Sequence, residues 1–176
     1  PYRSTIRYPR AWLYYAVSDA TTKLIRYVAH NRNLGLVYTD TSHARNTVPL
    51  QLWSDATWAP DYGNFYDNYR STTGWCSTAF DNLLSWSSHR QTVVAQSTPE
   101  SEWHAAADAA KEAAYIKNLF YELGIDCPRS VPLKCDNQST IKQSLNQVDQ
   151  RRCRHLGMKT NFLRQQCHAG HLSLSY

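Results

Sequence analysis

The apolar pattern of the chain is clearest between Ser97 and Gly124, where it has the 3.6-residue period of one long helix. Ser97 or Thr98 can cap the first N–H groups, and Pro99 suits the first turn. Gly124 is placed to end the helix with a positive φ. One face is apolar and mostly small, with Ala106, Ala109, Ala113, Ile116 and Phe120. Such a face predicts a helix that packs closely against a sheet.

One carboxylate interrupts this small apolar face. Glu102 lies on the same line as the alanines, in the first turns of the predicted helix. Glu100 is two residues earlier, on roughly the opposite face, and we interpret it as a capping residue. Glu102 is therefore expected to lie near whatever the sheet presents to the helix.

Two further acidic residues lie in short segments with the alternating pattern of strands. Asp55 lies in the segment 50–58, on the same face as Trp53 and opposite Leu50 and Leu52. Asp136 ends the segment 131–136. It shares a face with Lys134, whereas Leu133 and Cys135 point the other way. Each of these segments predicts a strand with one buried face.

Asp55, Glu102 and Asp136 together form a candidate metal site. Converging carboxylates repel one another unless a cation neutralises them. Mg²⁺ prefers carboxylate oxygens, and two such ions can clamp an in-line phosphoryl displacement. The alternative is that each acid is a solvated or capping carboxylate, since Glu102 would be favourable near any helix N-terminus.

The remaining pattern predicts an α/β fold. We expect a helix at 19–30, a short strand at 35–38, and a hairpin of strands 71–80 and 83–87 joined across Asp81–Asn82. A short helix at 137–145, a helix at 156–167 and a final strand at 172–176 follow. The strand after the long helix needs a crossover connection, so the predicted five-stranded sheet is mixed.

Composition favours a globular protein with a polyanionic partner. The 176 residues are 42% hydrophobic and carry a formal net charge of +5. No apolar run is long enough to span a bilayer, and the N-terminus lacks a secretory pattern. Five cysteines without a C-x-x-C pair favour reduced thiols and an intracellular location, with export as the open alternative. Since the chain does not begin with Met, we expect a fragment or a processed product.

Two other groups of side chains are candidates for binding. Arg151, Arg152 and Arg154 form a basic run that can contact phosphates, or an ordinary solvated surface. A cysteine and histidine cluster follows no common zinc pattern, so ligation is the minor alternative there. Its members are Cys153, His155, Cys167, His168 and His171. The tryptophans are expected to pack in the core rather than stack on bases.

Six segments of the chain occur in an order that resembles the ribonuclease H domain of Copia-type (Pseudoviridae) retrotransposon polyproteins. They are Trp53–Trp58 (WSDATW), Tyr69–Cys76 (YRSTTGWC), Asn82–Gln91 (NLLSWSSHRQ), Ser97–Trp103 (STPESEW), Ala109–Ala113 (AAKEA) and Cys135–Ser139 (CDNQS). The resemblance covers roughly residue 33 to the C-terminus. Upstream, residues 1–48 resemble the end of the connection between reverse transcriptase and that domain, and residues 49–176 the domain itself.

This resemblance implies an RNase H-like fold and a metal-dependent endonuclease, active in the cytoplasm or in retroelement particles, that cuts the RNA strand of RNA–DNA hybrids. Asp55, Glu102 and Asp136 match the family's metal ligands, with Mg²⁺ as the ion and Mn²⁺ as its alternative. Gln138 is similar to a residue that contacts RNA sugar hydroxyls, and its neighbour Asn137 is expected to contribute to substrate binding. A side-chain amide can both donate to and accept from a 2′-OH.

The sequence departs from the family pattern at three places. The C-terminal motif with a fourth carboxylate has no counterpart before Tyr176, Gly157 stands where an Asp is common, and Thr57 replaces a frequent acid. These departures favour a second hypothesis, a domesticated and catalytically weakened remnant that binds nucleic acid or a protein, with an exported, host-interacting effector as one form of it. Another two-metal polynucleotide enzyme with the same fold is the third.

Overall fold

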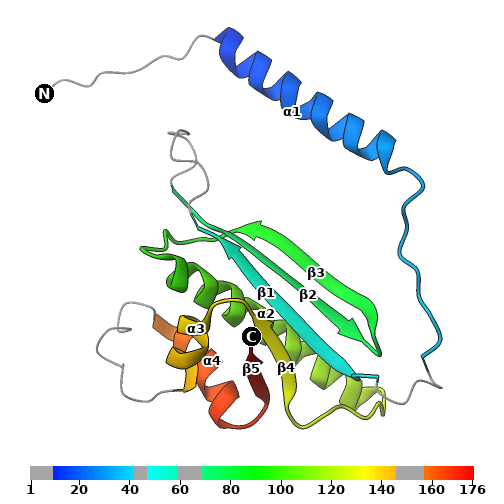
Figure 1. Cartoon of the computed structure of the whole chain (residues 1–176), viewed down its shortest axis with the longest axis vertical. Coiled ribbons are helices and arrows are strands. Elements are labelled where there is room, and N and C mark those ends of the chain that lie inside the picture. The colour runs from blue at the N-terminus through cyan, green and yellow to red at the C-terminus, as the bar shows by residue number, and fades with distance from the viewer. Residues whose placement is uncertain (1–9, 42–46, 59–68, 146–156) are drawn as a thin grey trace, which may run out of the picture. The chain divides into compact units, whose positions relative to one another are not determined.

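The computed structural model describes residues 10–41, 47–58, 69–145 and 157–176, which form two compact units. The first unit ends at Val37 and contains α1 (Arg10–His30), and the second runs from Tyr38 and contains the five described strands (Figure 1). Within the described residues helix α1 begins at Arg10, nine residues earlier than the apolar pattern predicts. The boundary between the two units lies at Val37, before residue 48. The assignment of residues 1–48 to the end of a reverse transcriptase connection therefore stays a prediction.

The segment that opens the second unit is held by side chains. The Thr39 N–H donates to Oδ1 of Asn82 over 2.8 Å, and the Thr41 hydroxyl donates to the Phe80 carbonyl over 2.9 Å. The predicted strand at 35–38 is wrong, since the structure has no regular element there. A strand needs a neighbouring backbone ladder, and a side-chain contact does not supply one.

The second unit is built on one mixed sheet of five strands. They are β1 (Leu50–Thr57), β2 (Thr72–Ala79), β3 (Asn82–Arg90), β4 (Val131–Cys135) and β5 (Leu172–Ser175). The strand order is β3-β2-β1-β4-β5 (Figure 1). The first three strands pair antiparallel, whereas β4 pairs parallel with both β1 and β5. The mixed sheet predicted from the sequence is confirmed.

The β2–β3 hairpin turns one residue earlier than the sequence predicts. Phe80 and Asp81 have positive φ values of 50° and 63°, and Asn82 already pairs with Ala79. Positive φ at both loop residues is the feature of a type I′ turn. The Phe80 ring stacks on Phe120 with centroids 6.2 Å apart, and this contact offsets the cost of a left-handed backbone at a bulky residue.

The predicted long helix is confirmed as α2 (Thr98–Glu122). The Ser97 side chain accepts from the Glu100 N–H, and Gly124 follows the helix with φ 68°. Glu100 in turn accepts from the Gln96 N–H over 2.8 Å. This reciprocal arrangement confirms Glu100 as a capping residue, and it holds the N-terminal turn of α2 in a fixed place.

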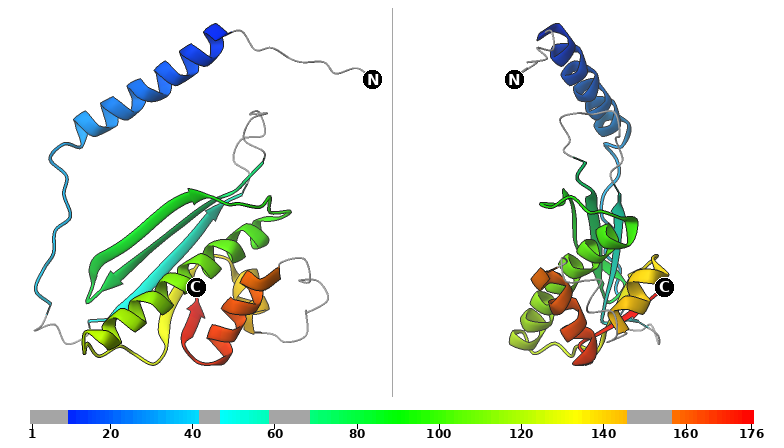
Figure 2. Two further views of the ribbon diagram at one scale, coloured as in Figure 1. Left: turned by 180° about the vertical axis from the view of Figure 1, so that it is seen from behind. Right: turned by 90° about the vertical axis from the view of Figure 1, so that its left-hand side faces the viewer.

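Helix α2 covers one face of the sheet and leaves the other accessible. Its alanine face packs on the inward side chains of β1 and β4, including Leu50, Leu52 and Leu133, each 0% exposed. Helix α4 (Gly157–His168) packs beside α2 on the same side of the sheet (Figure 2). Helix α3 (Gln138–Leu145) follows β4, and the Thr140 hydroxyl donates to the Pro99 carbonyl at the start of α2.

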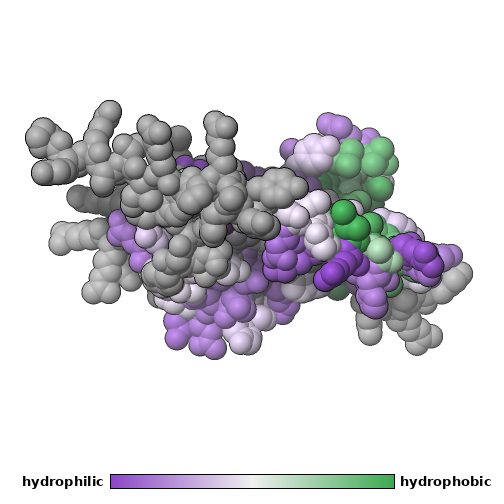
Figure 3. Space-filling model, turned by 90° about the horizontal axis from the view of Figure 1, so that it is seen from above, coloured by the Kyte–Doolittle hydropathy of each residue, from purple (hydrophilic) through white to green (hydrophobic). Residues whose placement is uncertain are grey.

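Helix α1 is amphipathic, and its apolar side chains from Val17 onward, the part of the helix whose burial the structure describes, are exposed. Leu24, Ile25 and Val28 are each more than half exposed. Hydrophobic and hydrophilic residues lie side by side on the surface seen in Figure 3. Among the described residues, none of the helices combines the length and the apolar character needed to cross a membrane.

Candidate metal centre

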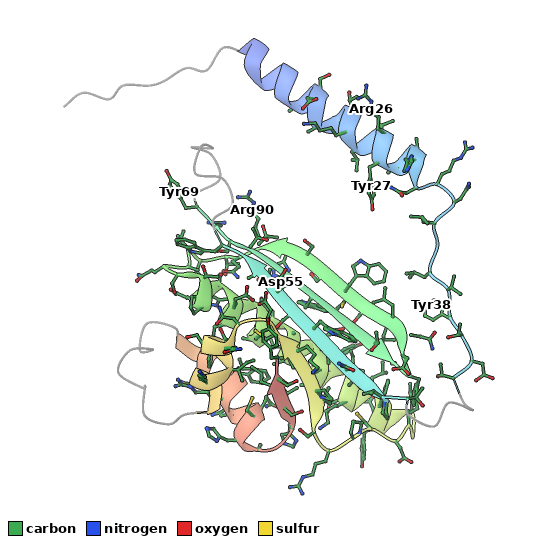
Figure 4. All side chains as sticks on the ribbon, in the orientation of Figure 1. Arg26, Tyr27, Tyr38, Asp55, Tyr69 and Arg90 are labelled. Carbon is green, nitrogen blue, oxygen red and sulfur yellow. The ribbon has the colours of Figure 1, made fainter. Side chains whose placement is uncertain are left out.

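The parallel pairing of β1 and β4 brings two of the candidate acids to the same edge of the sheet. Ser54 pairs with Cys135, so the next residues along the two strands are Asp55 and Asp136. Both carboxylates belong to exposed residues. Asp55 lies on β1 toward the end of the sheet where β3 finishes at Arg90 (Figure 4).

Glu102 approaches this edge from α2. Its Oε1 accepts from the Ala56 N–H of β1 over 3.2 Å, which ties the helix carboxylate to the strand backbone. The residue is only 3% exposed, and its second oxygen, Oε2, has no hydrogen-bond partner among the described residues. A buried carboxylate oxygen without a donor is costly, so this atom is poised for a ligand that can neutralise it.

Glu102 and Asp136 converge with a third side chain, Cys135. One ligand atom from each of the three residues lies within 4.8 Å of the other two. Asp55 is outside this close group, although it acts on Glu102 electrostatically. The structure therefore brings two of the three predicted ligands into one cluster and places the third beside it on the neighbouring strand.

The pKa of Glu102 is raised to about 7, chiefly because the residue is buried and then because the Asp136 carboxylate is close; the hydrogen bond from Ala56 lowers it, and Asp55 adds a smaller increase. The charged form of Glu102 is thus disfavoured by desolvation and by like charge. A cation shared with Asp136 would reverse both effects. The protonation state of Glu102 at neutral pH consequently depends on what the cluster binds.

The donor set fits a divalent cation. Mg²⁺ takes oxygen ligands at roughly 2.1 Å in an octahedral arrangement and usually keeps several waters. Glu102 Oε2 and the Asp136 carboxylate supply two anionic oxygens from two different elements, and Asp55 can add a third from β1. The exposure of Asp55 and Asp136 leaves room for the waters or for a substrate phosphate.

A cleft of about 750 Å³ opens beside the acids on the face of the sheet that α2 does not cover. Asp55 and Asp136 line it together with Lys134, Trp53 and Trp86. Trp86 is 60% exposed and Trp53 is 38% exposed, so the expectation that the tryptophans pack in the core is wrong for these two. Strand alternation turns them away from α2.

Other tryptophans do pack as expected. Trp103 of α2 is 1% exposed, and the guanidinium of Arg164 lies over its ring at 5.5 Å. Arg164 therefore contributes to packing between α2 and α4. Trp58 donates from Nε1 to the Ala95 carbonyl over 3.0 Å.

The predicted substrate-binding residues have different outcomes. Asn137 accepts from the Thr140 N–H over 3.1 Å, which gives it a capping role at the start of α3. Gln138 is the first residue of α3 and is exposed, two positions after Asp136. Arg151, Arg152 and Arg154 lie outside the described residues, as do Cys153 and His155 of the proposed cysteine and histidine cluster.

Cys135 is the member of the site that sequence reasoning missed. Alternation along β4 places it on the opposite face from Asp136, which argued against a common site. The strand ends at Cys135, however, and Asp136 belongs to the bend that follows. Because α2 brings Glu102 to that bend, residues from both faces meet there. The adjacency of a thiol to the acid in Cys135–Ser139 was the one available signal.

No family model matches the chain, but individual relatives do. It is 33% identical over 154 residues to a retrovirus-related Pol polyprotein from transposon RE1 of Arabidopsis thaliana, covering 88% of the chain and 10% of the relative. It is 27% identical to a transposon Ty1-ER2 Gag-Pol polyprotein of Saccharomyces cerevisiae, covering 91% and 9%. It is also 32% identical to the secreted RxLR effector protein 161 of Plasmopara viticola, covering 56% and 63%. The chain thus spans about a tenth of the Pol polyproteins it matches.

Solved structures with a similar fold include the prototype foamy virus protease-reverse transcriptase, with a TM-score of 0.50 and 15% identity over 79% of the chain and 19% of that protein. An RNase H1 isolated from compost has a TM-score of 0.48 and 13% identity, over 72% of the chain and 82% of that protein. The sheet order and the relatives agree with the resemblance of the sequence motifs. The chain has an RNase H-like fold and, over most of its length, is homologous to Copia/Ty1-type retrotransposon Pol polyproteins.

Proposed function

We propose that this chain hydrolyses the RNA strand of RNA–DNA hybrids endonucleolytically, with divalent metal ions held by Asp55, Glu102 and Asp136. The observation that carries the proposal is the meeting of a buried, unpartnered Glu102 oxygen with Asp136 at the edge of the sheet where Asp55 also lies. Homology to retrotransposon Pol polyproteins supports an RNase H function in general. We expect it to act inside the cell that carries the element.

In the proposed reaction the protein contributes by positioning the carboxylates that hold the metal ions. Bound Mg²⁺ or Mn²⁺ supplies charge neutralisation and a nucleophilic water, and two ions can stabilise the attacking and leaving oxygens of an in-line displacement. Glu102 is fixed by its bond from Ala56, and Asp136 is fixed by the end of β4. Asp55 presents its carboxylate from β1 toward the accessible cleft. These residues hold charge in place before the substrate arrives, so little reorganisation is needed.

Recognition of RNA requires contact with the 2′-OH. Gln138 is exposed two residues after Asp136, and its amide can both donate and accept. Asn137 uses its oxygen to cap α3, so its support for substrate binding acts through the placement of Gln138. We propose that Arg151, Arg152 and Arg154 contact phosphates and make binding dependent on salt.

Cleavage of a labelled RNA–DNA hybrid tests the proposal, in Mg²⁺ and separately in Mn²⁺. Asp136→Asn removes one charge at an exposed position and is expected to reduce the cleavage rate by about 100-fold or more while the far-UV circular dichroism is unchanged. Glu100→Gln is the matched control, because Gln also serves at the third position of a capping box. Cleavage by Asp136→Asn at the wild-type rate would overturn the site assignment.

A second candidate function is a binding module for nucleic acid or for a protein. Two observations favour it: Asp55 lies outside the close group of ligand atoms, and Trp53 and Trp86 are exposed beside the acids. The similarity to a secreted RxLR effector protein points the same way and would make export part of the function. Stacking on exposed aromatic rings binds bases without cutting them.

The same assay separates the two functions. Folded protein that binds the hybrid in a gel-shift experiment but does not cut it in either metal supports the nucleic-acid binding module. Folded protein that neither binds nor cuts the hybrid excludes both nucleic-acid functions and leaves the protein-binding module. Trp86→Ala should weaken binding by the module about tenfold or more, since stacking on one ring contributes roughly 1–3 kcal/mol.

A further inference from the structure

Cys135 is a buried thiol in direct reach of the proposed metal ligands. It is 2% exposed and is the last residue of β4. Burial raises the pKa of its thiol, while the backbone of Asn137 and the side chain of Ser54 act in the opposite direction by hydrogen bonding. The proposed hydrolysis with Mg²⁺ has no use for sulfur, because Mg²⁺ prefers oxygen ligands.

We propose that Glu102, Cys135 and Asp136 form a binding site for a thiophilic divalent cation such as Zn²⁺. The three residues supply one sulfur and two carboxylate groups, and their ligand atoms lie within 4.8 Å of one another. The site is therefore a mixed sulfur and oxygen site, distinct in its chemistry from the three-carboxylate site proposed for catalysis.

Glu102 gives independent support for a ligand at this place. Its Oε2 is buried and lacks a hydrogen-bond donor among the described residues, while Oε1 is held by the Ala56 N–H. The side chain is thus anchored at one oxygen and open at the other. A cation bound to Oε2 satisfies a buried atom that the described residues leave without a partner.

The distances suit zinc. Zn–S bonds are about 2.3 Å and Zn–O bonds about 2.0–2.2 Å, so a tetrahedral ion places its sulfur and oxygen ligands roughly 3.6 Å apart. The three side chains reach that separation by small rotations, since each pair of ligand atoms lies within 4.8 Å. Three protein ligands leave a fourth position for water on the exposed side of Asp136.

The sulfur ligand also determines which divalent ion the site prefers. Soft thiolate ligands select Zn²⁺ over Mg²⁺, and the general affinity order of divalent ions favours Zn²⁺ over Mn²⁺. Zn²⁺ in the cluster takes Glu102 and Asp136 away from the proposed catalytic ions. It therefore inhibits cleavage at concentrations far below those of Mg²⁺, a consequence that rests on the proposed function, whereas the binding itself does not.

Titration of the whole chain with Co²⁺, followed by Zn²⁺ competition, tests the binding. A cobalt–thiolate bond gives a sulfur-to-metal charge-transfer absorption in the near ultraviolet that oxygen ligands do not give. We expect this band in the wild type and its loss in Cys135→Ser, with the apparent affinity for Zn²⁺ weakened on the order of tenfold or more. Cys153→Ser and Cys167→Ser are the matched controls. They remove cysteines of the alternative cysteine and histidine cluster, not of the proposed site, and should therefore keep the band.

Asp136→Asn provides a second variant in case Cys135→Ser does not fold. Asp136 is exposed, so this change should leave the fold intact and weaken Zn²⁺ binding as well. A band that persists in Cys135→Ser, or one that disappears in Cys153→Ser or Cys167→Ser, would overturn the proposal.

Hybrid cleavage is measured on the same samples to keep the two proposals apart. A Cys135-dependent band in a chain that cuts no hybrid supports the zinc site and contradicts the proposed nuclease. Cleavage of the hybrid without a Cys135-dependent band supports the proposed nuclease and contradicts the zinc site. If both hold, micromolar Zn²⁺ should inhibit the wild type at least about tenfold more strongly than Cys135→Ser.

Discussion

The two faces of the sheet differ far more than their common strands suggest. On the face covered by α2, Leu50, Leu52 and Leu133 pack against a helix of alanines and exclude water. On the other face the alternate residues of the same strands, including Trp53, are accessible and line a cleft. The covered face is filled by packed side chains around these leucines, whereas the accessible face holds a cleft of about 750 Å³.

The candidate metal centre lies where the two faces meet. Glu102 comes from the covered side and Asp55 from the accessible side, while Asp136 follows the end of β4 between them. A site in this position combines a desolvated carboxylate with exposed ones. Desolvation strengthens the interaction with a cation, and exposure allows a large polyanionic substrate to reach it.

The largest difference between the faces is expected in packing. Leu133→Ala removes a fully buried side chain beneath α2 and should lower the free energy of unfolding by about 2–5 kcal/mol. Leu84→Ala makes the same chemical change on β3, where the side chain is 41% exposed, and should cost less than about 1 kcal/mol. Urea unfolding of both variants measures this, and equal losses would contradict the comparison.

An intermediate effect is expected from the buried carboxylate. Because the pKa of Glu102 is about 7 in the folded chain, against an ordinary value of 4.5, the folded protein holds a proton that the unfolded chain loses. The contribution is fully present below about pH 4.5 and is lost as the pH rises through about 7, by at most about 3 kcal/mol.

Urea unfolding of metal-free protein from pH 4.5 to 8 measures this contribution. Glu102→Gln should flatten the decline in stability, since its amide does not titrate, whereas Glu100→Gln should keep it. Added Mg²⁺ should stabilise the wild type more at pH 8 than at pH 5, because ligation requires the ionised carboxylate. A decline that is unchanged in Glu102→Gln would show that other groups cause it.

The smallest effect on stability is expected on the accessible face. Trp86 is 60% exposed, so Trp86→Ala should change the free energy of unfolding by about 1 kcal/mol or less, even though it removes a large aromatic side chain. Guanidinium unfolding monitored by circular dichroism measures the change. A loss of several kcal/mol would mean that Trp86 is buried in solution, and the two faces would then contribute similarly to the free energy of unfolding.

Much of the local structure could be predicted because it depends on short-range signals. The Ser97 cap, the alanine face and Gly124 specify α2 within one segment, and the alternation around Leu52 and Leu133 specifies two strands with buried faces. Errors arose where a signal was ambiguous by one residue, as in the hairpin turn. There, the stacking of Phe80 on Phe120, which is distant in the sequence, selected the loop.

The sequence by itself determined the class of fold, the family resemblance and the identity of three candidate acids, because residue type and periodicity are local properties. Only the tertiary structure decided which of them share a site. Parallel pairing of β1 with β4 places Asp55 beside Asp136, and the packing of α2 brings Glu102 to Cys135. Burial and proximity to Asp136 then raise the pKa of Glu102 to about 7. Distance and desolvation arise from packing, and they determine whether neighbouring charges repel or bind a cation.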